Sequence, residues 1–148
     1  MTTRPLSRLQ VAARLLDSLN GLQRVWDARW RQICDEAEVH ASQAQALLFL
    51  CDRGPMPMRD LASGLCVAPS TGTRLIEQME KVGWVARSGD PGDRRRVLIH
   101  LLGPGEEKAW TLQALAQEAL WSHASGLGDA ESALSSLERL TGLLSRND

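Results

Sequence analysis

The stretch Asp93-Arg94-Arg95-Arg96-Val97-Leu98-Ile99-His100-Leu101 places three consecutive arginines beside an aspartate and directly before a β-prone run. Another β-prone run, Trp84-Val85-Ala86-Arg87, precedes it, and residues 88–93 between the two are rich in Gly, Asp and Pro. Two apolar runs on either side of a turn-rich segment are typical of a β-hairpin. We therefore predict a hairpin with a long polar tip, and we expect the three arginines to lie in the loop.

Three adjacent arginines are difficult to pack in a protein core, but they are suited to binding a negatively charged partner. The narrow minor groove of DNA has a negative potential that attracts arginine. A neighbouring carboxylate such as Asp93 can brace one guanidinium, so that less side-chain entropy is lost on binding. An ordinary solvated turn is the alternative interpretation of the same residues.

The segment before the hairpin has the pattern of two helices joined by a short turn. Residues 58–65 form an amphipathic stretch, and residues 64–68 provide the turn. Pro69 is suited to the first position of a second helix, and Gly83 is suited to its C-terminal end. This order predicts a helix-turn-helix whose second helix covers 69–83.

That second helix starts with Pro69-Ser70-Thr71-Gly72-Thr73-Arg74. In a helix-turn-helix, residues near this end meet base edges in the major groove. The candidates for DNA contact are therefore Ser70, Thr71, Thr73 and Arg74, and the free N–H groups of the first turn favour an anion nearby. For this hexapeptide alone, an ordinary helix start with capping hydroxyls is the alternative.

The rest of the chain is predicted to be helical. Ser42 and Gln45 have the spacing of a capping box at the start of the second helix. Asn20-Gly21 interrupts the first helix and permits a kink or a break there. Before and after the helix-turn-helix and hairpin, helices are expected over 6–38, 42–53, 106–124 and 129–145.

Bulk composition limits the class of protein. The chain has 148 residues, a net charge of −1 and 43% hydrophobic residues, which suits one soluble globular domain over 1–148. No apolar run is long enough to cross a bilayer, and residues 1–5 lack the apolar core of a secretory signal. Three scattered cysteines imply no disulfide framework. We expect a cytoplasmic protein without a membrane partner.

Charge is distributed unevenly along the chain. Residues 1–33 carry six Arg against two Asp, and residues 84–100 carry four Arg against two Asp. Residues 102–148 hold seven acidic against three basic residues. A basic centre can focus a positive field onto one surface even when the net charge is near zero.

Several function classes have no support in the sequence. His40, His100 and His123 are isolated, and no Cys-x-x-Cys occurs, so we expect no metal site. Gly103-Pro104-Gly105 lacks the Lys-Ser/Thr of a phosphate-binding loop, and no serine lies in a nucleophile elbow. We therefore expect no catalytic residue, no cofactor and no enzymatic activity.

Together, these motifs resemble those of the MarR-type winged-helix regulators of bacteria and archaea. Asp93–Leu101, followed by Pro104-Gly105, is similar to the wing signature of that family. Ser42 and Gln45 match the capped entry to its second helix. The remaining matches, in order and spacing, are Leu61-Ala62, Pro69-Ser70-Thr71, Thr73-Arg74-Leu75 and Gly83-Trp84-Val85-Ala86-Arg87.

The resemblance implies a mainly α (α+β) fold. It consists of a winged helix-turn-helix DNA-binding lobe over 39–102 and a three-helix dimerisation region, formed by the N- and C-terminal helices over 6–38 and 103–148. It implies a homodimeric transcriptional regulator, expected to be a repressor, that binds pseudo-palindromic double-stranded DNA. By position, Arg95 is the minor-groove arginine, Asp93 is its brace, and Arg94 and Arg96 contact phosphates.

Regulators of this type often respond to a small aromatic or phenolic effector in a crevice between the dimer helices and the lobe. The residues available for such a crevice are Trp26, Arg29, Trp30, His40 and Trp110, with core packing of the tryptophans as the alternative. Cys66 lies in the helix-turn-helix turn, where oxidation can disturb DNA binding, and Cys51 is expected to be a buried small hydrophobe.

A winged-helix protein-interaction module without DNA binding is the alternative function. Such modules usually lack a charged wing, so the arginine cluster argues against it. The chain also departs from the family pattern. Leu102 stands where a capping Thr is usual, so Gly103 is expected to act as a weaker cap. Pro57 and Ala68 replace frequent capping residues, and Gly72 replaces a β-branched one.

Overall fold

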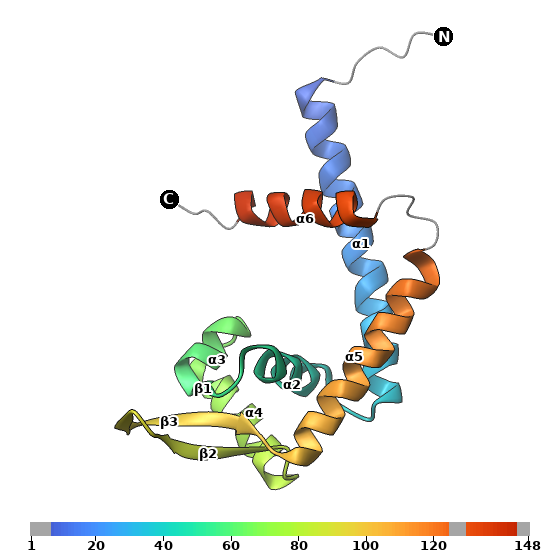
Figure 1. The fold of residues 1–148 in the computed structure, drawn as a ribbon. Helices are drawn as coiled ribbons and strands as arrows, with labels where there is room; N and C mark the ends of the chain where they lie inside the picture. Colours follow the sequence, from blue (N-terminus) through green and yellow to red (C-terminus); the bar gives the residue numbers. More distant parts are fainter. Residues whose placement is uncertain (1–6, 125–129, 145–148) are drawn as a thin grey trace. The chain divides into compact units, whose positions relative to one another are not determined.

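The computed structural model describes residues 7–124 and 130–144. Its elements are mostly helices with a small antiparallel sheet, which confirms the predicted fold class (Figure 1). By backbone contacts the chain divides into two compact units, residues 1–113 and 114–148, which are described separately. In chain order the elements are α1 Arg8–Glu36, α2 Ala41–Arg53, β1 Met56–Pro57, α3 Met58–Gly64, α4 Pro69–Lys81, β2 Val85–Asp90, β3 Asp93–Leu101, α5 Gly103–Ala124 and α6 Ala130–Leu144.

The sheet has the strand order β1-β3-β2. β2 and β3 form the predicted hairpin, and β1 adds a short third strand that the sequence analysis missed, with Met56 opposite Ile99. Proline within a strand is confined to edges, and Pro57 lies in this two-residue edge strand before α3 begins. The sheet therefore ties the start of the helix-turn-helix to the hairpin.

The core of the first unit lies where α2, α3, α4, the sheet and the start of α5 meet. α4 contributes a stripe of apolar residues that includes Leu75, Ile76 and Met79. Residues three and four positions apart share one face of a helix, so this stripe turns the opposite, polar face outward. The largest fully buried side chains are Leu47, Leu61, Ile76, Met79, Ile99, Leu112 and Val85.

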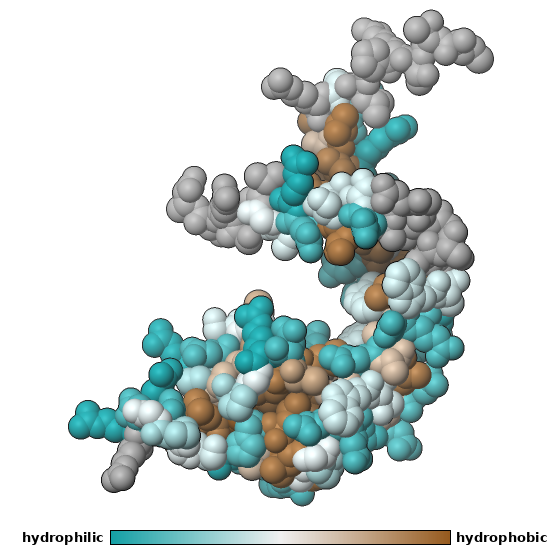
Figure 2. Space-filling view, in the orientation of Figure 1, coloured by the Kyte–Doolittle hydropathy of each residue, from teal (hydrophilic) through white to brown (hydrophobic). Residues whose placement is uncertain are grey.

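α1 is capped by Ser7, whose hydroxyl accepts the Gln10 backbone N–H, while the Gln10 side chain accepts the Ser7 N–H. The helix runs without a break through Asn20 and Gly21, so the interruption considered there does not occur. Ile33 and Cys34 in its last turns are buried, but much of its earlier apolar surface is exposed: Leu9 is 81% exposed and Val25 is 70% exposed. Figure 2 shows apolar side chains at the surface of this helix.

The start of α2 differs from the predicted one. The helix begins at Ala41, and His40 is its N-cap residue in an extended conformation. The side-chain oxygen of Gln43 accepts the His40 backbone N–H at 3.3 Å. The predicted Ser42–Gln45 capping box is therefore wrong, because the chain enters the helix two residues earlier and Gln43 takes the reciprocal position.

The join between the hairpin and α5 also differs from the expectation. The Leu102 N–H donates to the Trp84 carbonyl at 2.9 Å, and the Glu106 N–H donates to the Leu102 carbonyl at 2.9 Å. Leu102 is thus the N-cap position and Gly103 is already helical, so the expected cap at Gly103 is wrong. Gly105 is buried directly against the backbone of Trp84.

α5 is attached to the end of α1 by one polar contact. The ammonium of Lys108 donates to the carbonyl of Ala37, the residue that ends α1, at a distance of 2.7 Å. A cation at a helix C-terminus interacts favourably with the unpaired carbonyls there. The contact joins two segments that are far apart in the sequence and holds the first turns of α5 in place.

Gly105→Ala is expected to destabilise the fold by about 1–3 kcal/mol, the usual cost of overpacking. A Cβ at this position would collide with the carbonyl oxygen of Trp84, which is backbone and has little freedom to move. Gly103→Ala is the matched control, because a Cβ there meets nothing within 4 Å. Thermal unfolding of both variants is the measurement, and equal melting temperatures would contradict the close approach.

Candidate nucleic-acid interface

The helix-turn-helix consists of α3 and α4 joined by residues 65–68. Cys66 in this turn has a positive φ of 54°, and the Val67 N–H donates to the Ala62 carbonyl at 3.0 Å. The two helices approach closely at Gly72, where a Cβ would lie 3.2 Å from the Cβ of Ala62. The glycine at position 72, where the family pattern has a β-branched residue, therefore has a packing reason. A β-branched side chain there would push α4 away from α3.

The N-terminal end of α4 is open to solvent. Ser70, Thr71 and Arg74 are exposed, as predicted for DNA-contacting residues, whereas the Thr73 hydroxyl donates to the Pro69 carbonyl at 2.9 Å. Ala68, the N-cap residue, supplies no side-chain hydrogen bond. The first-turn N–H groups thus keep the positive partial charge that attracts anions at helix N-termini.

The hairpin has an irregular register at its tip. Pairs run regularly from Val85 opposite Leu101 to Gly89 opposite Val97, but the next residue, Asp90, pairs with Asp93. Residues 94–96, the three arginines, consequently have no partner on β2 in this register. They lie within β3 rather than in a loop, so the predicted location is wrong, and a bulge in the strand presents them instead.

Asp93 holds the backbone of this bulge. Its carboxylate accepts the Arg95 N–H at 3.0 Å, and the Asp90 carboxylate accepts the Gly92 N–H at 2.8 Å across the turn. This carboxylate oxygen holds the main chain at Arg95, and the expectation that Asp93 also braces a guanidinium stays a prediction. Arg95 and Arg96 are exposed, whereas the side chain of Arg94 lies outside the described part. The free end of the hairpin is hydrophilic (Figure 2).

One ion pair links the hairpin to the recognition helix. Nε of Arg87 on β2 lies 3.4 Å from a carboxylate oxygen of Glu80 near the end of α4, and both side chains are partly shielded from water. Exposed ion pairs contribute little to stability. This pair is a polar contact between the base of the hairpin and the C-terminal end of α4.

The five expected effector residues come from α1, the start of α2 and α5. Trp26 and Trp30 stack on α1 with ring centroids 6.1 Å apart, and Arg29 beside them donates to Gln32 at 3.1 Å. His40 is exposed at the start of α2. The indole N–H of Trp30 is buried and has no partner among the described residues.

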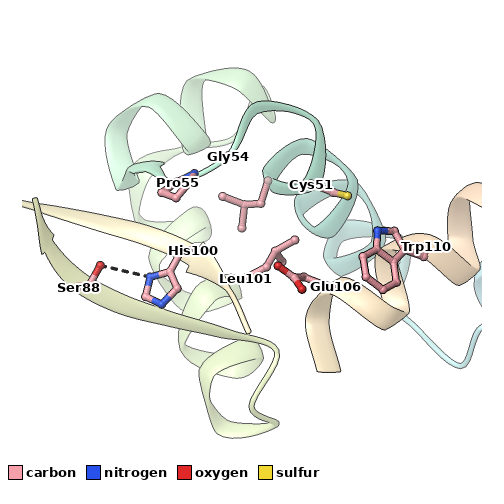
Figure 3. A pocket seen from close by; sticks show the side chains of 9 residues that line it. Cys51, Gly54, Pro55, Ser88, His100, Leu101, Glu106 and Trp110 are labelled. Atoms are coloured by element: carbon pink, nitrogen blue, oxygen red, sulfur yellow. Dashed lines mark hydrogen bonds between the residues drawn. The ribbon is translucent and has the colours of Figure 1, made fainter. Parts of the chain in front are cut away.

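Trp110, the fifth, lines a cavity with residues of α2, the hairpin and α5 (Figure 3). Sequence reasoning missed this cavity because its lining comes from three separate segments that only the fold brings together. Cys51 lies in its wall and is half-buried, so its predicted burial is corrected.

The other two cysteines differ in environment. Cys34 is buried, and burial together with the nearby Asp35 raises the pKa of its thiol, which keeps it protonated. Cys66 is exposed in the helix-turn-helix turn.

In the described residues no three metal-ligating side chains gather at one point. Within the same ranges, the helices are all too short or too polar to cross a membrane.

Comparison with known proteins decides the family. The model of the MarR family matches residues 39–97, the part that holds the helix-turn-helix and most of the hairpin. The HTH-type transcriptional regulator YsmB of Bacillus subtilis (strain 168), itself uncharacterized, is 32% identical over 134 residues, which cover 90% of each chain. The chain belongs to the MarR family.

Solved structures agree with this membership. A MarR-family protein from Bacillus stearothermophilus superposes with a TM-score of 0.85 at 25% identity, covering 95% of this chain and 100% of that one. NadR in complex with 4-hydroxyphenylacetate has the same fold, with a TM-score of 0.76 at 21% identity over 100% and 99% of the two chains. This MarR-family chain is thus a transcriptional regulator with the winged helix fold predicted from its sequence.

Proposed function

We propose that this MarR-family regulator binds pseudo-palindromic duplex DNA as a homodimer and represses transcription. The observation that carries the proposal is the hairpin bulge at residues 94–96, which places the exposed Arg95 and Arg96 on the same compact unit as the open N-terminus of α4. The relatives are transcriptional regulators, so the alternative of a protein-interaction module has no support. The proposal places the protein in the cytoplasm and includes no catalytic step.

The two elements have different roles in this proposal. α4 enters the major groove, where Ser70, Thr71, Thr73 and Arg74 reach bases and phosphates. The hairpin reaches the adjacent minor groove with Arg95, and Arg94 and Arg96 contact phosphates. Asp93 fixes the backbone of Arg95, and that hydrogen bond reduces the entropy lost when the bulge is ordered on DNA.

Arg95→Ala is expected to weaken specific DNA binding by roughly 1–3 kcal/mol. The melting temperature should hardly change, because the side chain is exposed. Arg31→Ala, an exposed arginine on α1, is the matched control. Gel shifts over a range of salt concentrations are the measurement, since each lost phosphate or groove contact also lowers the salt dependence. Unchanged affinity, or binding that ignores salt, would remove the hairpin from the mechanism.

Dimerisation is proposed through the terminal helices of 6–38 and 103–148, around a DNA-binding lobe of 39–102. The support is apolar surface exposed on the single chain, because monomeric proteins rarely leave large contiguous apolar patches in water. On α1 and α6 the exposed large apolar residues are Leu9, Val11, Leu15, Leu16, Leu22, Val25, Leu134 and Leu137.

Removing residues 130–148 is expected to abolish the dimer before it unfolds the lobe, because α6 would carry part of the shared apolar surface. Light scattering gives the mass, and circular dichroism reports the lobe. A second variant, Leu134→Ser with Leu137→Ser, keeps the helix, and Glu138→Ser is its control on the same element. A dimer of unchanged mass in both altered proteins would refute the proposed interface.

A small aromatic or phenolic effector is proposed to bind near the stacked tryptophans. Trp26 and Trp30 offer an aromatic surface, the buried Trp30 N–H needs an acceptor, and Arg29 can pair with a carboxylate. His40 and Trp110 are the remaining members of the proposed set. NadR was solved with 4-hydroxyphenylacetate, which combines a phenol and a carboxylate. The same chemical class is the first choice for this chain.

4-Hydroxyphenylacetate is therefore expected to raise the melting temperature, since a ligand specific for the native state stabilises it. Trp30→Phe keeps an aromatic ring but deletes the donor, and loss of one hydrogen bond should weaken binding about fivefold. Trp121→Phe, at an exposed position, is the control. If the aromatic acid binds Trp30→Phe as tightly as the unmodified protein, the indole N–H has no part in recognition.

A further inference from the structure

The cavity beside Trp110 has a volume of about 550 Å³, within the range of small-molecule sites. Its walls come from the C-terminal end of α2, the base of the hairpin and the first turns of α5, all within the first compact unit. The lining residues are Leu50, Cys51, Gly54, Pro55, Ser88, His100, Leu101, Glu106 and Trp110. Among them are one carboxylate and no lysine or arginine.

The basic residues nearest to this lining in the sequence are directed elsewhere. Arg53 lies over the ring of Phe49, 4.7 Å from its centroid, and pairs with Asp52. Arg87 pairs with Glu80, and Lys108 donates to the end of α1. Within the described residues, the structure therefore gives the Glu106 carboxylate no ion-pair partner.

The groups around Glu106 suit an apolar body attached to a positive charge. Trp110 follows Glu106 by four residues, so the two side chains share one face of α5, and Trp110 is 58% exposed. Figure 3 shows the Glu106 carboxylate between the indole and the imidazole of His100. The imidazole Nδ1 lies 3.3 Å from the Ser88 hydroxyl, which orients the ring.

We propose that this cavity binds a small organic cation, with its ammonium group at Glu106 and against the face of Trp110. Among aromatic side chains, the indole of tryptophan attracts a cation over its face most strongly. Leu50 and Leu101 provide contact for the apolar part. This site goes beyond the regulator's proposed DNA binding and differs in charge from the aromatic-effector set, with which it shares only Trp110.

The test measures binding of benzyltrimethylammonium to the free full-length protein by calorimetry. Benzyl alcohol is the neutral comparator and phenylacetate is the anionic one. The cation is expected to bind at least about threefold more tightly than the alcohol, as ion-pair and cation–π contributions imply. Glu106→Gln should remove that advantage and leave the affinity for benzyl alcohol unchanged. Glu107→Gln is the matched control, because its carboxylate is adjacent in sequence and does not line the cavity.

Histidine resonances locate the site in the same sample. With three histidines in the chain, the His100 signal can be assigned through His100→Gln, and it should shift on addition of the cation while the His40 signal does not. No binding of the cation, equal losses in Glu106→Gln and Glu107→Gln, or an unmoved His100 signal would each overturn the proposal. DNA is absent from the experiment, so a failure of DNA binding would leave its result unaffected.

Discussion

The backbone of α5 passes against the backbone of Trp84 at Gly105, and the relation between the hairpin and the helices depends on this contact. The Trp84 carbonyl accepts the N–H of Leu102, the residue after β3, and Gly105 leaves room for that carbonyl within the first turn of the helix. α5 then carries Lys108 to the end of α1. A side chain at position 105 would therefore displace three segments together.

In the hairpin, the residues that anchor it to the fold lie at its base, and the arginines lie near its tip. Regular pairs from Val85 to Gly89 fix its base, and the buried Ile99 anchors β3 in the core. Beyond them the register shifts, and the arginines occupy positions without a partner on β2. At the tip, side-chain carboxylates replace strand-to-strand hydrogen bonds as acceptors for the backbone. Asp90 accepts the N–H of Gly92, and Asp93 accepts the N–H of Arg95. Removing the arginines would thus leave the pairing of the base intact.

Sequence patterns predicted the elements well and their junctions less well. Helical periodicity and the glycine after α4 gave the helix-turn-helix, because these signals are local. The caps at Ser42 and Gly103 were wrong, since a shift of one or two residues depends on tertiary contacts such as the one to Trp84. The two-residue strand at Met56 has no local signal. The cavity could not be predicted from local patterns either, because its lining residues come from separate segments of the chain.

The arrangement of charge explains how a chain with a net charge of −1 can present a positive surface. Arg53 and Arg87 are paired with nearby acids, so neither adds to the field of the hairpin. The positive charges of the exposed Arg95 and Arg96 do contribute to that field. Anions are therefore favoured at that surface. A cation is repelled from the hairpin and attracted to Glu106, so the two signs of charge direct ligands to different parts of one compact unit.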